Sequence, residues 1–451
     1  MKLGEKLTEG PIPKKFMLFV IPVIITSFLQ QLYNTADTVI IGQYAGKSAL
    51  AAVSATSSVS ALIITLFMGL SVGTNVVCAA FFGAENKEGL SKTLHTSILL
   101  GVILGVPLTL AGWFGAERFL TYTGTPQDVL PDATLYMKLF FLGIPASLTY
   151  NFGSAVLRAI GETKKPLYIL SVSGISNVLL NYIFVALFGQ GVAGVALGTI
   201  VSQFISAVWV IIIFVKSRDE LHLSIKKLRI YPKEFKRILS IGIPSGLNGI
   251  MFSLSGVIIQ TAINSFETAA VAAHGATWNY MTFSNLLIAA GEQGCISFVG
   301  QNMGAKKYER VQKTVKFGLL TMTAASIVFS LIIVVFARPL IGIFSADEEI
   351  INLGMVQILC AISVYFLYVP DLVLGGALRG MGKSMIPTII NLVCICLLRI
   401  LWIWFVWKPF HPDALEWVYY SFPVTWMVSG IAMTAAYITV SKRIFYGGKQ
   451  E

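Results

Sequence analysis

Long apolar runs alternate with short polar segments along the whole chain. A helix that crosses the hydrocarbon core of a bilayer, about 30 Å thick, needs roughly 20 mostly apolar residues. Twelve runs reach that length, and we predict a membrane-spanning helix in each of them. They lie at about 16–41, 51–82, 92–116, 133–157, 166–188, 191–215, 236–263, 270–300, 316–336, 353–378, 385–407 and 415–441.

The two halves of the chain share an internal repeat. LRAIGETKKP, which begins at Leu157, returns as LRGMGKSMIP at Leu378, a shift of 378 − 157 = 221 residues. ALAAVSAT at Ala49 and AVAAHGAT at Ala270 are separated by the same shift. Such a duplication in an apolar chain is typical of transporters, in which a site between two similar lobes opens alternately to either side. We therefore predict an all-α protein with an N-terminal six-helix lobe at 1–215, a cytoplasmic linker at 216–235 and a C-terminal six-helix lobe at 236–451.

Composition and charge placement favour the same interpretation. Hydrophobic residues make up 55% of the chain and charged residues 12%, about half the charged fraction of a soluble domain. Most of the 33 Lys and Arg residues fall in alternate loops, which the positive-inside rule assigns to the cytoplasm together with both termini. The net charge of +11 follows from this bias and requires no nucleic-acid partner. The outer loops hold only Lys47, Arg118, Arg338 and Lys408.

Several classes of function lack their characteristic residues. GMGKS, at 380–384, resembles the end of a phosphate-binding loop, but its glycine spacing is one residue off and no nucleotide-binding sheet surrounds it. The five cysteines lie within predicted spans without a CxxC pair, and the four histidines are scattered. We therefore expect no disulfide, no zinc site, no catalytic residue, no cofactor and no nucleotide. Transport would be driven by an ion gradient or run downhill.

Polar groups inside the first span are the leading site candidates, because an ionised side chain at mid-membrane costs about 2.5–3.5 kcal/mol. Gln30, Tyr33, Asn34 and Asp37 share one helical face. Pro22 removes a backbone donor and should bend this helix. A carboxylate among amide and phenol oxygens can hold a sodium ion or exchange a proton.

Other polar groups occupy later spans. Asn177 and Asn181 share a face of the fifth span, where they bind either an ion or a neighbouring helix. Glu292 and Asp371 are acids in the eighth and tenth spans, and the first repeat has no acid at the matching positions. Because the scaffold repeats and the acids do not, we interpret them as functional. One of them is also a potential ion-pair partner for Arg399.

Three motifs resemble the multidrug and toxic compound extrusion (MATE) family. They are YNTADTVIIGQYAGKSALAAVSA in the first two spans, LRAIGETKKP after the fourth and VGQNMGA at the end of the eighth, and the resemblance covers essentially the whole chain. It implies antiport, in which protons or sodium ions enter while amphipathic, often cationic organic compounds leave. It also implies that Asp37 is the family's first-span aspartate and that Pro22 is the proline linked to helix bending. Tyr33, Asn151, Asn177 and Thr199 match ion-site or cavity positions of one subgroup.

The chain departs from that subgroup at Asn181, where the subgroup has a second aspartate. The loss of a negative charge should weaken sodium binding, so we favour protons as the coupling ion and keep sodium at Asp37 as the alternative. Asp371 matches the tenth-span acid of another bacterial subgroup, whose seventh-span acid has no counterpart here before Glu267. Residues able to contact a flat cation in the substrate cavity are Trp278, Tyr280, Met281 and Phe283, with Gln30 and Asn34.

Two alternatives share parts of this description. A flippase for lipid-linked saccharides would have the same scaffold but usually a strongly cationic cavity, whereas Lys138 and Arg399 are the only basic residues that lie inside the predicted spans rather than at their ends. A membrane-embedded transferase would need a His and Asp cluster at one membrane face. We therefore expect a monomeric antiporter of a bacterial cytoplasmic membrane, with amphipathic small molecules and the lipid bilayer as its partners.

Overall fold

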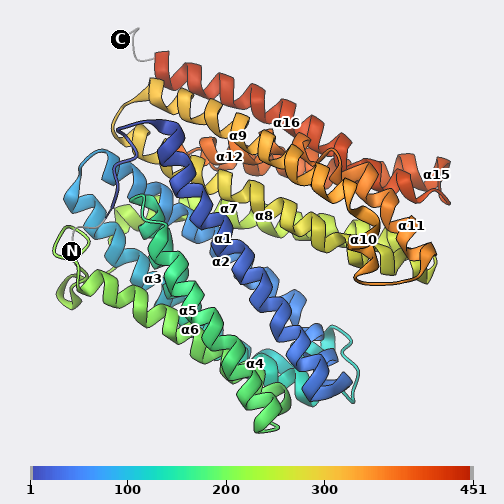
Figure 1. Ribbon diagram of the computed structural model, residues 1–451. Helices are drawn as coiled ribbons and strands as arrows, with labels where there is room; N and C mark the ends of the chain where they lie inside the picture. Colours follow the sequence, from blue (N-terminus) through green and yellow to red (C-terminus); the bar gives the residue numbers. More distant parts are fainter. Residues whose placement is uncertain (1–3, 447–451) are drawn as a thin grey trace. The chain divides into compact units, whose positions relative to one another are not determined.

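The computed structural model describes residues 4–446, without the side chains of 57–62 and 446. All regular elements within this range are helical (Figure 1). The α-helices are α1 Ile12–Ile40, α2 Gly46–Gly83, α3 Lys87–Tyr122, α4 Leu130–Ala159, α5 Lys164–Asn181, α6 Gly191–Val215, α7 Pro232–Ile263, α8 Thr268–Gly304, α9 Tyr308–Val335, α10 Ala337–Gly342, α11 Glu348–Gln357, α12 Val369–Gly380, α13 Met385–Asn391, α14 Leu398–Trp402, α15 Lys408–Phe410 and α16 Leu415–Tyr446. The π-helical segments are η1 Ile41–Ala45, η2 Tyr182–Leu187, η4 Ile358–Ile362, η6 Leu392–Leu397 and η7 Ile403–Trp407, and the 3₁₀ segments are η3 Ile225–Lys227 and η5 Tyr365–Tyr368.

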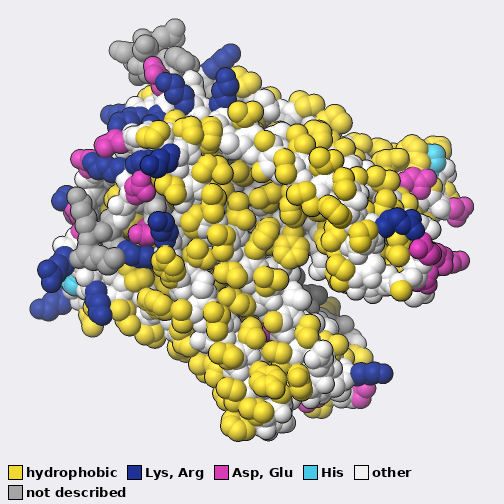
Figure 2. All heavy atoms as spheres, viewed as in Figure 1, with side chains coloured by type: hydrophobic (Ala, Val, Ile, Leu, Met, Phe, Trp, Pro, Cys, Tyr) yellow, Lys and Arg dark blue, Asp and Glu magenta, His cyan; other side chains and the backbone are white. Residues whose placement is uncertain are grey.

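These helices are those of a multi-pass membrane protein. Among the described residues, ten helices are long and apolar enough to cross a membrane. An eleventh span results if the segments 348–362 and 365–380, which meet at a 41° bend, are counted as one. α8 has 37 residues but is not among them, because its many small and polar side chains lower its hydropathy. On the face drawn in Figure 2, hydrophobic side chains cover the lengths of the helices, and Lys and Arg side chains gather beyond helix ends. The all-helical prediction is confirmed.

The internal repeat extends to the backbone conformation. Glu85 (φ 55°) and Lys306 (φ 56°) are the non-glycine residues with positive φ in the described part of the chain, and they lie 306 − 85 = 221 residues apart. Gly161 (φ 82°) and Gly382 (φ 77°) are separated by the same shift and follow the ends of α4 and α12. Glycine suits these left-handed positions because it has no Cβ. The repeated motif is therefore a repeated helix end.

Alanine at these two glycines should have unequal effects on stability. A Cβ at Gly382 would meet nothing within 4 Å, so Gly382→Ala pays only for the left-handed backbone, about 1–2 kcal/mol. A Cβ at Gly161 would also lie 2.5 Å from the backbone oxygen of Glu5, so Gly161→Ala should lower the unfolding temperature further. Thermal unfolding of the two purified variants in one detergent measures the difference. Equal losses would contradict a role for the Glu5 contact.

The chain forms two compact units, each with its own buried apolar cluster. The first unit contains Ile21–Gly242 and the N-terminal residues up to Leu7, and the second contains Thr8–Val20 and the chain from Ile243. Leu157 lies in the cluster of the first unit and Leu378 in that of the second, both with 0% exposure. The repeated motif thus begins at a corresponding core position in each unit.

The start of α1 groups with the second unit. The ring centroid of Phe16 lies 5.4 Å from that of Phe298 and 5.7 Å from that of Phe317. Lys307 Nζ donates to the backbone oxygen of Thr8 at 3.1 Å. The boundary between units inside α1 falls between Val20 and Ile21, immediately before Pro22.

The predicted linker, 216–235, is counted with the first unit. The backbone N–H of Ser224 donates to His95 Nε2 of α3 at 3.1 Å, and that of Tyr231 donates to Thr96 Oγ1 at 3.2 Å. These two hydrogen bonds attach the linker to α3 at two points, seven residues apart in the chain. The linker is therefore an ordered part of this unit.

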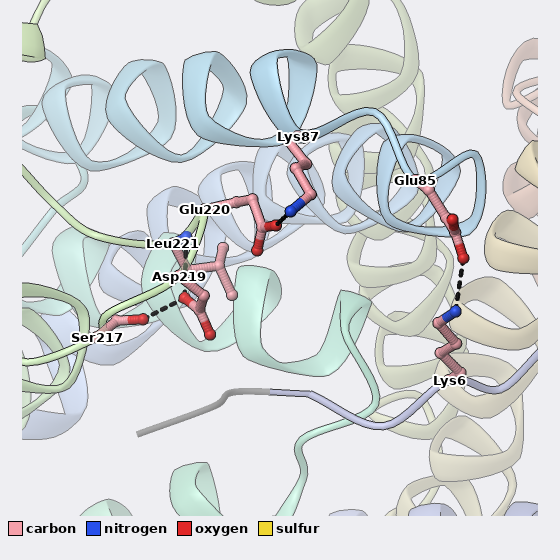
Figure 3. A network of polar contacts seen from close by, with 7 residues as sticks. All are labelled: Lys6, Glu85, Lys87, Ser217, Asp219, Glu220 and Leu221. Atoms are coloured by element: carbon pink, nitrogen blue, oxygen red, sulfur yellow. Dashed lines mark hydrogen bonds and ion pairs between the residues drawn. The ribbon is translucent and has the colours of Figure 1, made fainter.

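Ion pairs add to the attachment on the polar side of the first unit. Figure 3 shows Glu220 of the linker beside Lys87, which begins α3, and Lys6 beside Glu85, 2.5 Å apart. The hydrogen bond from Lys87 holds the pKa of the Glu220 carboxyl below its usual value. Both pairs are exposed to solvent, so each contributes about 1 kcal/mol or less.

Candidate functional site

The first unit brings together the acid and the amides singled out in the sequence. Asn181 Nδ2, from the end of α5, donates to Asp37 Oδ1 of α1 at 2.6 Å. Asn177, one helical turn earlier, donates through Nδ2 to Thr199 Oγ1 of α6 at 3.3 Å. Asn177 and Asn181 are buried, with exposures of 5% and 0%. Four of the predicted residues therefore line a polar track across α1, α5 and α6.

Tyr33 lies one turn before Asp37 on the same helix and joins this track through α5. Its hydroxyl donates to the backbone oxygen of Ser171 at 3.4 Å. The aromatic ring covers Gly174, where an added Cβ would lie 1.8 Å from a ring carbon. The face of α1 that was predicted from spacing thus packs directly on α5 at this point.

A glycine on α6 makes room for the Asp37 contact. A Cβ at Gly198 would lie 2.0 Å from Asn181 Oδ1, so Gly198→Ala should push the amide away from Asp37. We expect most coupled transport to be lost, measured as substrate efflux from vesicles under an imposed gradient. Gly115→Ala on α3 is the matched control, because its Cβ would meet nothing within 4 Å. Equal activity of the two variants would show that this amide contact is dispensable.

Asn151 has a different place from the other first-unit candidates. Its Nδ2 donates to the backbone oxygen of Ser147 at 2.9 Å within α4. With Gln203 of α6 it lines a cavity of about 10 Å³, the size of one water molecule. Gln203 was not singled out in the sequence, although its Oε1 is buried without a hydrogen-bond partner. A single amide side chain in a membrane span is common and usually bonds a neighbouring helix, so nothing in the sequence singled out Gln203 as a site residue.

Glu292 forms a buried ion pair in the second unit. It lies on α8, and Arg379 Nη1 in the last turn of α12 donates to its Oε1. The side chains are 15% and 4% exposed. Arg379 follows the end of the predicted tenth span by one residue, and the structure shows that it belongs to the last turn of α12 and is buried. A lone acid in an apolar span was the signal that a basic partner had to lie nearby.

Asp371 lies in a separate buried network of the second unit. Its Oδ1 accepts a hydrogen bond from Ser429 on α16. Ser429 is 3.3 Å from Asn391 Oδ1 of α13, and Asn391 Nδ2 donates to Asn248 Oδ1 of α7 at 3.0 Å. Asp371 Oδ2 is buried without a partner. Sequence reasoning missed these three polar partners because each is a single polar residue in a different span.

The suggested pairing of Arg399 with Glu292 or Asp371 is wrong. Arg399 Nη1 donates to Ser255 Oγ at 2.8 Å, and Nη2 donates to Thr425 Oγ1 at 3.0 Å. Arg399 is absent from the ion pairs of the described residues, where Glu292 pairs with Arg379 instead. Arg379 lies in the last turn of α12, which packs on α8, and it therefore pairs with Glu292 in place of Arg399.

The candidate cavity residues divide by exposure. Gln30, Asn34 and Trp278 are exposed, the last at 37%. Tyr280 donates through its hydroxyl to the backbone oxygen of Leu340 at 2.8 Å, and Met281 is 6% exposed. Phe283 is partly buried. Their role in binding a substrate stays a prediction.

The polar track at Asp37 has one carboxylate and no cluster of metal ligands. Within residues 4–446, no group of three or more His, Cys, Asp or Glu side chains lies close enough to hold a metal ion. The track can bind and release a proton or a weakly held monovalent cation at the carboxylate. Asn181 presents its N–H to Asp37 Oδ1, so this amide stabilises the carboxylate as a hydrogen-bond donor.

Comparisons with known proteins agree with the repeat and the fold. The chain is 28% identical to the probable multidrug resistance protein YpnP of Bacillus subtilis (strain 168), over 87% of this chain and 88% of that protein. It is 26% identical to the probable multidrug resistance protein NorM of Thermotoga maritima, over 86% of this chain and 84% of that protein. A solved structure of the outward-facing conformation of a multidrug resistance MATE family transporter has a TM-score of 0.92 at 21% identity. It covers 98% of this chain and 99% of that chain and shows that the fold is shared.

The family model named MatE matches this sequence twice, once in each half. The matches cover residues 22–183 and 244–405. The first contains the part of α1 from Pro22 onward, with Asp37, and the second contains α8 and α12 with Glu292 and Asp371. Because the two matches together account for more than half of the residues, the chain belongs to the MatE (multidrug and toxic compound extrusion) family of membrane transporters.

Proposed function

We propose that this protein is an antiporter that exports amphipathic, often cationic organic compounds from the cytoplasm in exchange for an inward-moving cation. The observation that carries the proposal is the contact between Asp37 and the buried amide of Asn181. An acid within a membrane-spanning helix costs free energy, so its presence there marks a functional site. The names of the relatives, which are multidrug resistance proteins, support the class of substrate.

The proton is the favoured coupling ion. A sodium ion is bound by several oxygen atoms, whereas Asn181 turns its amide N–H toward Asp37. One subgroup of the family has a second aspartate at position 181, whereas this chain has the neutral Asn181. The track therefore has a single negative charge with which to hold a sodium ion. A carboxylate held by a single amide donor supports exchange of a proton better than stripping of a hydrated sodium ion.

Coupling follows from competition for one charge. Ionised Asp37 attracts a cationic substrate, and protonation removes that charge and releases the substrate outward. We propose that transport proceeds by alternating access, which the internal repeat makes possible. We propose that a single chain is the working unit, with both termini in the cytoplasm.

Transport of ethidium into proteoliposomes tests this function. The purified chain is reconstituted, and ethidium movement is followed by fluorescence under an imposed pH gradient and, separately, an imposed sodium gradient. We expect uptake driven by the pH gradient and collapsed by a protonophore. Uptake driven by sodium alone would replace the proton by sodium. No movement under either gradient would reject the drug antiporter and favour a lipid-linked substrate.

A further inference from the structure

The second unit contains a buried arginine whose charge is not compensated by a neighbouring acid. Arg399 lies in α14, between the π-helical segments η6 and η7, and is 2% exposed. Its guanidinium carbon is 4.4 Å from the ring centroid of Phe422. Ser255 and Thr425, both with 0% exposure, accept one hydrogen bond each from its terminal nitrogens.

The donors of this guanidinium are only partly used. A guanidinium carries five N–H donors, and the two hydrogen bonds to Ser255 and Thr425 occupy two of them. Arg399 Nε is buried without a partner. Donors of a charged group therefore remain available, and hydrogen bonds from such a group to an anion are stronger than those between neutral groups.

The groups around Arg399 supply no negative charge at neutral pH. Tyr365, Tyr368 and Cys396 are the titratable side chains that interact with it electrostatically, and phenols and thiols are neutral there. The two acids that lie inside predicted spans of this unit, rather than at their ends, have other partners: Glu292 pairs with Arg379, and Asp371 accepts from Ser429. A buried cation without a counter-charge is strongly unfavourable.

We propose that Arg399 forms a binding site for a small monovalent anion, with its free Nε–H as a donor and the Phe422 ring and the two hydroxyls fixing the guanidinium. The anionic group is either an inorganic ion of chloride type or the carboxylate of an exported compound. This site goes beyond the cation exchange at Asp37, because it lies in the other unit and takes the opposite charge.

The other buried charges of the second unit provide a second test of the anion site. The charges of Glu292 and Arg379 cancel each other. Asp371 and Arg399 both interact electrostatically with the phenol of Tyr368. Asp371 is buried in the same unit, so its negative charge repels an anion bound at Arg399. Removing its charge by Asp371→Asn should tighten anion binding, and the effect requires no change in the site itself.

Equilibrium binding of radioactive chloride to the detergent-solubilised protein tests the proposal. Total ionic strength is held constant with sodium gluconate. We expect saturable binding that approaches one chloride per chain, loss of this binding in Arg399→Met, and tighter binding in Asp371→Asn. Arg118→Met, which replaces an exposed arginine at the far end of α3, should bind as the unmodified protein does. Absence of saturable binding to the unmodified protein would overturn the proposal, and so would unchanged binding in Arg399→Met.

Two additions keep the test decisive if Arg399→Met fails to fold. Ser255→Ala retains the charge but frees the guanidinium to move, and it should weaken chloride binding by several-fold. Unchanged affinity in a folded Ser255→Ala would count against the geometry. Benzoate is added as competitor: displacement of chloride assigns the site to organic carboxylates, and failure to displace it assigns the site to inorganic ions. Neither result depends on cation coupling at Asp37, so the two proposals fail separately.

Discussion

Replacing Asp37 by asparagine should reduce gradient-driven ethidium transport to the leak rate of protein-free vesicles. Asparagine keeps the size of the side chain and its ability to accept from Asn181, so the contact between α1 and α5 survives. It removes the group that carries a charge and a proton. Ethidium binding, measured by fluorescence polarisation, should weaken toward low pH in the unmodified protein because protons compete with the dye. It should become independent of pH in the variant.

Two further variants define what a failure would mean. Asp37→Glu retains the acid and should keep part of the coupled transport. Asp128→Asn removes an exposed carboxylate from the segment before α4 and should transport as the unmodified protein does. Coupled transport that survives in Asp37→Asn would move the coupling site to the second unit, to Glu292 or Asp371.

Replacing Glu292 by glutamine should give the largest loss of stability. Arg379 is 4% exposed and would be left without its counter-charge on α8. Breaking a buried ion pair by removing one partner destabilises a protein by about 3–5 kcal/mol. Thermal unfolding in detergent, followed by tryptophan fluorescence, should show a large fall in the unfolding temperature.

The double variant and an exposed pair provide the controls. Glu292→Gln with Arg379→Met removes both charges and should recover much of the loss, because no uncompensated charge remains. Glu348→Gln breaks the pair with Arg338, whose side chains are 71% and 53% exposed, and should change stability by about 1 kcal/mol or less. A loss in Glu292→Gln no larger than that in Glu348→Gln would show that the buried pair is not structural.

The sequence predicted the scaffold well because two long-range patterns agree. Apolar runs predicted the spans, and the shift of 221 residues predicted that both halves adopt the same local structure. The paired positive φ values at Glu85 and Lys306 confirm this at the level of single residues. Spacing showed which residues share a face of α1 or of α5, and the family resemblance alone linked Asn181 to Asp37.

Partners between distant spans were not predictable from one sequence. The ion pair of Glu292 with Arg379 joins residues 87 positions apart, and helical periodicity carries no information on which faces of two helices meet. Arg399 was linked to an acid because charge balance suggested it, whereas the structure surrounds it with hydroxyls and aromatic rings. The polar network of Asp371 could not be predicted for the same reason, because its members come from four different helices.

The division of α1 at Pro22 means that the two halves of the gene product are not separable by one cut. A protease that cleaved in the linker between α6 and α7 would release an N-terminal fragment that still carries residues 8–20. Those residues form part of the apolar interior of the other unit, where Phe16 packs on Phe298 and Phe317. The two fragments would therefore stay associated, because residues 8–20 of the N-terminal fragment remain packed in the second unit. If the chain arose by fusion of two copies of a six-helix ancestor, each copy would contribute residues to the folded unit of the other.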